Sequence, residues 1–274
     1  MQPVHSILVY SHIAIGMIAV IAFWIPLATR KGSRWHKRSG AVYVWSMYAV
    51  SLTAFITCVM TLVDPIGVRA PARNLDPATA YAAAEQSRLF ALFLLMLSIL
   101  VFASLRHGLM VLRTRQQPTI LANRLHRATI ITMGIISIAV GILGLQHMRW
   151  LLIIFAVLGL SGSVGMWRDT RITQWRRHER LIAHFNGLIG TGIGAYTAVF
   201  AFGGSRILAQ LLPGQWQVIP WILPTIIGTI AIAKLKQHYT PGTNKGRQHE
   251  NVKQHYPKPA HGLTAHDEHR MAAR

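Results

Sequence analysis

The sequence is poor in cysteine and in acidic residues, and each shortage argues against a class of site. The single cysteine, Cys58, rules out disulfides within the chain and metal sites built from several thiolates. Only eight Asp and Glu residues occur among 274 positions, and all eight lie outside the long apolar runs. A carboxylate within the bilayer usually marks an ion or proton pathway. We therefore expect neither paired-carboxylate catalysis nor a cation-coupled transport site inside a membrane.

Charged residues of any sign are also scarce. They make up 13% of the chain, against 52% hydrophobic residues, whereas soluble domains carry about a quarter charged residues. Seven apolar runs are long enough to cross a hydrocarbon core ~30 Å thick, and backbone groups in lipid must bond within the chain, which favours helices. The expected spans are 5–29, 39–63, 89–112, 128–146, 150–167, 181–203 and 216–233. The sequence therefore predicts an all-α membrane protein, a seven-transmembrane-helix bundle over residues 1–237.

The basic residues fall on alternate sides of these runs. All but five of the 28 Lys and Arg lie in 30–38, 106–127 and 168–180 or after position 233. By the positive-inside rule, this places the N-terminus outside and the C-terminus in the cytosol. The net charge of +20 is then explained by attraction to anionic lipid headgroups, and no nucleic-acid partner is expected.

The segments outside the spans give two further expectations. Residues 238–274 are polar and lack apolar periodicity, so we predict a disordered, basic, His-rich cytosolic tail. The histidine spacing in this tail matches no zinc motif. In the outer connection 64–88, Asp76-Pro77 is typical of a helix start and predicts a short surface helix before the third span.

The tripeptide Arg-x-His recurs at the starts of the second, fourth and sixth spans. The residues are Arg34 and His36, Arg124 and His126, and Arg176 and His178. The recurrence indicates either three repeated two-helix hairpins followed by a terminal helix, or the ordinary gathering of basic residues at cytosolic helix starts. These six side chains are candidates for a rim that binds an anion or a lipid headgroup. The alternative is simple interfacial anchoring.

Four other histidines lie in or beside the spans. His107 and His184 are expected at similar depth near the cytosolic surface. Facing imidazoles at one depth could ligate a b-type haem whose propionates meet the basic rim. His12 and His147 could form a second, outer site. The competing interpretation is that all four form hydrogen bonds between helices or to lipid.

Small residues recur at close intervals in two spans. Gly159, Gly162 and Gly165 follow one another in the fifth span, and 187, 190 and 194 are glycines in the sixth. Such spacing lets helix backbones approach closely in lipid. The pattern predicts a tightly packed bundle without a wide pore between these two helices.

The first hairpin resembles an uncharacterised bacterial inner-membrane family, a domain of unknown function. The resemblance rests on His12-Ile13-Ala14-Ile15-Gly16, on the turn from Arg30 to Gly40, and on Val42-Tyr43-Val44-Trp45. Arg177-His178 and the stretch 195–200 are similar to a later helix of that family. Ala41 stands where the family tends to have Arg. The resemblance implies a bacterial inner-membrane location and singles out His12, His36, Gly40 and His178.

These features lead to one functional hypothesis and several alternatives. We expect a membrane protein that binds a ligand or cofactor (haem b, a quinone or an anionic lipid) in redox or lipid chemistry. The alternatives are a transporter or facilitator of a small neutral or anionic solute, and a structural or assembly protein. A membrane-protein partner or a second copy of the chain fits each of them. No nucleophile–base pair in the sequence indicates an enzyme.

Overall fold

The computed structural model describes residues 2–69, 75–204, 216 and 218–240. Within these residues all regular structure is helical and no strand occurs. Seven helices are long and apolar enough to cross a membrane, which confirms the predicted all-α, seven-helix, multi-pass architecture. The predicted tail at 238–274 lies almost wholly outside the described residues, and positions 238 and 239 belong to the last helix.

Except for the start of the third, which lies well before the predicted residue 89, the seven long helices begin and end close to the predicted spans. They are α1 (Gln2–Ala28), α2 (Arg34–Val63), α4 (Pro77–Arg113), α5 (Arg124–Gln146), α6 (Trp150–Asp169), α7 (Arg177–Ala198) and α9 (Ile219–Tyr239). A π-helical turn, η2 (Val199–Gly203), continues α7, and the short helices α3 (Pro65–Arg69) and η1 (Ile120–Ala122) lie in connections. Most helices extend beyond the apolar run, because polar caps and charged first turns prolong them outside the hydrocarbon region.

Capping residues explain where three of the helices begin. The Ser33 side chain accepts a hydrogen bond from the backbone N–H of His36, and Asn123 accepts one from the N–H of Leu125. Asp76 accepts bonds from the amides of Ala78 and Thr79 at the start of α4. The predicted start at Asp76 is confirmed, but the separate surface helix is wrong. Helix α4 runs unbroken for 37 residues, about 55 Å at ~1.5 Å per residue.

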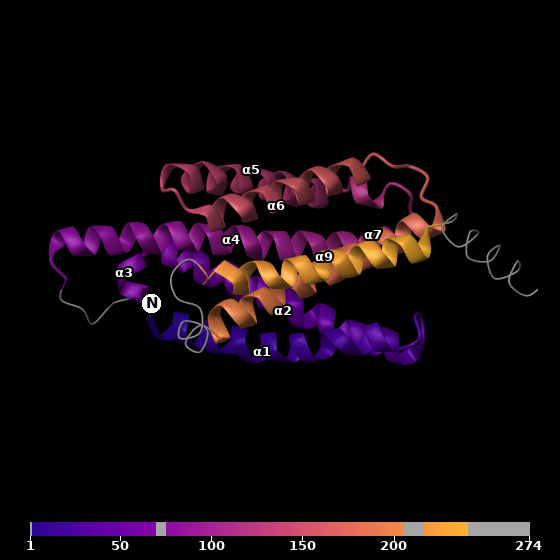
Figure 1. Ribbon diagram of the computed structural model, residues 1–274, viewed down its shortest axis with the longest axis horizontal. Helices are drawn as coiled ribbons and strands as arrows, with labels where there is room; N and C mark the ends of the chain where they lie inside the picture. Colours follow the sequence, from indigo (N-terminus) through magenta and orange to yellow (C-terminus); the bar gives the residue numbers. More distant parts are fainter. Residues whose placement is uncertain (1, 70–74, 205–215, 217, 241–274) are drawn as a thin grey trace, which may run out of the picture.

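The long helices are packed antiparallel in chain order, with α4 at the centre (Figure 1). α4 packs against α2, α5, α6 and α7; α1 packs against α2 and α7, and α9 packs on α7. The connections 29–33, 114–123 and 170–176 and the C-terminal end of α9 therefore lie at the same end of the bundle. We call this the basic end, because it carries most of the cationic residues.

Glycine determines how closely the central helices approach. A Cβ at Gly187 of α7 would lie 2.7 Å from the carbonyl oxygen of Ser104 and 3.0 Å from the Cα of Gly108, both on α4. A Cβ at Gly159 of α6 would overlap the hydroxyl of Ser137 on α5. In contrast, Gly165 and Gly190 have open space around them. Only one glycine of each predicted series therefore makes a close contact with a neighbouring helix: Gly159 in the first series and Gly187 in the second.

Candidate functional site

A chain of three polar side chains links α4, α5 and α6 near the basic end. His107 Nε2 lies 2.9 Å from Asp169 Oδ2, and His107 Nδ1 lies 3.1 Å from His126 Nε2. The two imidazole rings are stacked, with centroids 5.3 Å apart. His107 and His126 are buried, at 4% and 0% exposure, whereas the Asp169 side chain is 29% exposed. These hydrogen-bonded side chains therefore lead from Asp169 at the bundle surface to the fully buried imidazole of His126.

The hydrogen positions in this chain follow from the chemistry of its ends. An ionised carboxylate only accepts, so the Nε2 of His107 carries a hydrogen and donates it to Asp169. With a neutral ring, Nδ1 of His107 then accepts from the Nε2–H of His126. This tautomer leaves a lone pair on Nδ1 of His126. That atom is buried and has no hydrogen-bond partner among the described residues.

Two arginines lie close to the inner end of the chain. The charge of Arg106 acts on His126, and Arg127 follows His126 in α5 with its guanidinium 5.8 Å from the ring centre of Trp167. The Nε atoms of both arginines are buried without a partner in the described structure. Buried polar groups are normally paired. Two unpaired arginine donors and one unpaired imidazole acceptor therefore occur in this part of the bundle, where a polar ligand could pair with them.

The bundle becomes apolar directly beyond His126. Ile130 and Met133 of α5 pack with Ile99 and Ala103 of α4 in one buried cluster. The polar chain is therefore a half-path, open at the basic end and closed toward the middle of the bundle.

The structure brings His107 to His126 and Asp169 and leaves His184 in a different contact. The Nδ1 atom of His184 donates to the backbone oxygen of Gly108, at 2.8 Å. His107 and His184 are thus at similar depth, as expected. Both ring nitrogens of His107 are already engaged, so this arrangement does not fit the expected haem ligated by His107 and His184.

The Arg-x-His residues divide into outward-facing arginines and inward-facing histidines. Arg34, Arg124 and Arg176 are exposed. His36 is half-buried with Nδ1 3.1 Å from the oxygen of Pro26 in α1, and His126 is fully buried. His178 is half-buried, and no hydrogen bond of its ring occurs in the described residues. The arginines remain candidates for a headgroup rim, whereas His126 faces the protein interior and not the lipid surface.

The cap positions show that the three tripeptides are not equivalent. His36 and His126 are each the third residue after a polar cap, Ser33 or Asn123. In the third tripeptide Arg176 is itself the cap, and its backbone N–H donates to Glu179 at 2.8 Å. His178 is therefore displaced by one residue, which is about 100° around the helix.

The two histidines expected at an outer site contact different elements. The Nδ1 atom of His12 in α1 lies 3.1 Å from both the oxygen of Val50 and the hydroxyl of Thr53 in α2. His147 lies in the turn after α5 and approaches Glu85 of α4, with 4.0 Å between Nε2 and Oε1. His12 therefore joins the first two helices, and His147 belongs to a separate surface.

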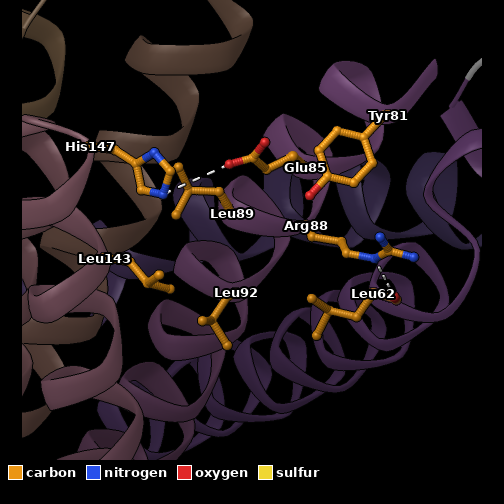
Figure 2. Close-up of a pocket in the computed structure, with 8 residues that line it drawn as sticks. All are labelled: Leu62, Tyr81, Glu85, Arg88, Leu89, Leu92, Leu143 and His147. Carbon is orange, nitrogen blue, oxygen red and sulfur yellow. Dashed lines mark hydrogen bonds and ion pairs between the residues drawn. The ribbon is translucent and has the colours of Figure 1, made fainter. Parts of the chain in front are cut away.

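That surface is an open groove (Figure 2). It is lined by residues near the end of α2 and the start of α4, so it lies at the end of the bundle opposite the basic end. Its volume is about 280 Å³. Glu85 and His147 face each other across it, and Arg88 Nε donates to the oxygen of Leu62 at 3.3 Å. The remaining lining residues are Tyr81, Leu89, Leu92 and Leu143. Glu85 thus pairs with His147 and Arg88 with a backbone oxygen, and most of the other lining residues are leucines.

Asp169 is the residue of the buried chain that sequence reasoning missed. The sequence predicts a position outside the membrane for Asp169, because it follows the last apolar residue of the fifth span. Helix α6 extends to Asp169 itself, and this last turn carries the carboxylate back to His107. The sequence feature that could have indicated this role is an acidic residue within one helical turn of a span, in a protein with only eight acidic residues.

Comparisons with protein-family models, with curated proteins and with solved structures give no match.

Proposed function

We propose that this chain is a bacterial inner-membrane protein that binds a lipid-soluble redox ligand of the quinone class near its basic end. That end faces the cytosol in this proposal. The observation that carries it is the Asp169–His107–His126 chain, which ends in a buried nitrogen without a partner. The positive-inside rule supports the orientation, because cationic residues gather at the same end.

The chemistry of a quinol suits this nitrogen. A quinol hydroxyl donates a hydrogen bond, and the neutral Nδ1 of His126 accepts one. If His126 takes the proton, its Nε2 hydrogen passes to His107, and the Nε2 hydrogen of His107 passes to Asp169. In this way the proton reaches Asp169, which is partly exposed to solvent, and neither His126 nor His107 keeps a positive charge. Loss of this proton leaves an anionic oxygen on the ligand, and in this proposal the guanidinium of Arg106 donates a hydrogen bond to that oxygen.

The same geometry favours ligand binding over solute passage. A transport path must continue to the opposite surface, whereas the layer of Ile99, Ile130 and Met133 closes the bundle beyond His126. An anionic headgroup would use the exposed arginines alone and would not need a proton acceptor in the interior. A ligand that donates a proton uses both the cationic residues of the basic end and the buried acceptor, His126.

A binding titration tests the proposal. The purified protein in nanodiscs is titrated with decylubiquinol and with decylubiquinone, and binding is followed by quenching of tryptophan fluorescence. We expect saturable binding, at least 10-fold weaker quinol binding in His126→Ala, and unchanged affinity in the control His178→Ala. Asp169→Asn should retain quinone binding and weaken quinol binding. Absence of saturable binding in the wild type, or equal affinity in His126→Ala, would overturn the proposal.

A further inference from the structure

A second pair of histidines faces across α2 and α7 at the basic end. These helices run in the same direction, because each is an even-numbered span that starts at this end (Figure 1). Their register is fixed by Tyr43 of α2, whose hydroxyl lies 2.8 Å from the Thr191 hydroxyl and 3.4 Å from the Leu188 oxygen of α7. Tyr43 is buried, and Phe23 of α1 packs on its ring with centroids 5.5 Å apart.

The register brings His36 opposite His184. His36 precedes Tyr43 by seven residues, and His184 precedes Thr191 by seven residues. Seven residues are two helical turns, which return to nearly the same face. Both rings therefore lie in one layer below Tyr43.

Both rings are held in the same tautomer by backbone carbonyls. Nδ1 of His36 donates to the oxygen of Pro26, and Nδ1 of His184 donates to the oxygen of Gly108, at 3.1 and 2.8 Å. A hydrogen on Nδ1 leaves the lone pair on Nε2. Neither Nε2 has a hydrogen-bond partner in the part of the chain that the structure describes. An imidazole whose Nδ1–H is fixed by a carbonyl is the usual form of a metal-ligating histidine.

The number of ligands and the surrounding charge select the kind of metal. A bare zinc site takes four ligands, or three and a water, whereas no group of three metal-binding side chains occurs among the described residues. The surroundings are also cationic: Arg34, Lys37 and Arg177 are exposed nearby. The Lys31 ammonium donates to the same Pro26 oxygen as His36, and burial lowers its pKa. This setting repels a free cation.

A haem fits both the small number of protein ligands and the cationic surroundings. Its iron takes four nitrogens from the macrocycle and needs only two axial ligands from the protein. Its two propionates are anionic and pair with arginine and lysine. The helices α2 and α7 meet through the long side chain of Tyr43 and are not among the closely packed helix pairs.

We propose that His36 and His184 are the two axial ligands of a b-type haem at the basic end of the α2–α7 interface, with its propionates among the exposed cations. This site rests on the register of α2 and α7 and does not depend on the quinone proposal, which uses α4, α5 and α6. It replaces the expected pairing of His107 with His184.

Haemin titration of the detergent-solubilised protein tests the site. We expect binding of one haemin per chain with a six-coordinate, low-spin spectrum, and a narrow α band after reduction with dithionite. His36→Gly and His184→Gly should each lose the low-spin spectrum, and added imidazole should restore it. His178→Ala is a matched control from the same end of the bundle and should keep the wild-type spectrum.

Several outcomes would contradict the haem site. One is the lack of stoichiometric haemin binding by the wild type. Another is an unchanged low-spin spectrum in the folded His36→Gly, His184→Gly double variant, with folding checked by its thermal transition. A third is one-to-one binding of Zn²⁺ that needs both histidines, with no low-spin haemin complex. This last result would assign the pair to a bare metal ion. Imidazole rescue separates loss of a ligand from loss of the fold.

Discussion

His184 donates to the backbone oxygen of Gly108 where α4 and α7 come closest. The bond has an ordinary length of 2.8 Å, and it lies beside Gly108 and Gly187, which face each other with no Cβ between the two backbones. The position of this imidazole is therefore set by a glycine contact one turn away. The close packing of α4 on α7 therefore also fixes the position of His184, the proposed haem ligand.

Replacement of Gly187 by alanine should loosen the contact between α4 and α7. The new Cβ would lie 2.7 Å from the Ser104 oxygen, so the helices must separate, at a cost of about 1–3 kcal/mol. The measurement is thermal unfolding in detergent. Gly190→Ala is the control on the same helix, because nothing lies within 4 Å of its Cβ. A transition temperature equally high in Gly187→Ala and Gly190→Ala would contradict the close approach.

The two stacked histidines should be energetically coupled. His126→Ala leaves Nδ1 of His107 unpaired in a buried place, which costs about 1–3 kcal/mol and adds a cavity. In a double-mutant cycle with His107→Ala, the double variant should be less destabilised than the sum of the single variants. Denaturant unfolding of the four proteins measures the coupling. Strict additivity would mean that the pair forms no hydrogen bond.

The start of α4 should depend on pH through Asp76. Its side chain accepts hydrogen bonds from Thr79, which is the main reason that its pKa lies below the ordinary 3.8, with the amides of Thr79 and Ala78 adding to the effect. A carboxylate with a lowered pKa stabilises the fold above the unfolded pKa. That stability is lost as the pH falls through the folded value.

We therefore expect the first turn of α4 to fray only in acid, below about pH 4, near the unfolded carboxyl pKa. Amide exchange of Ala78 and Thr79 as a function of pH measures this fraying, after correction for the intrinsic pH dependence of exchange. Asp76→Asn keeps a capping oxygen without the charge, so its corrected protection should be independent of pH. Equal pH dependence in Asp76→Asn would show that another group controls this helix start.

Reporter fusions test the orientation of the bundle. We expect alkaline phosphatase to be active when fused after position 75 and green fluorescent protein to be fluorescent when fused after position 240. The reason is that two spans precede the first site and seven precede the second. Activity of both fusions in one compartment would contradict seven spans, and a reversed result would contradict the positive-inside assignment alone.

The sequence predicted the helices well because the bilayer imposes a simple length and polarity rule. It did not predict which histidines meet. His107 of α4 bonds His126 of α5 and Asp169 of α6. The pattern of apolar runs gives the length of each helix but does not show which faces of two helices contact each other. The seven-residue spacing from His36 to Tyr43 and from His184 to Thr191 was readable, but it acquires meaning only once Tyr43 is known to bond Thr191.

The central place of α4 also has a consequence for biosynthesis. As the chain emerges, α1 and α2 enter the membrane before α4, and His12 can already bond Val50 or Thr53 within that first hairpin. His107 arrives later without partners. It gains His126 only when α5 is inserted and Asp169 only when α6 is complete. The Nε2–H of His107 therefore stays without its carboxylate acceptor until α6 has been synthesised to its last residue.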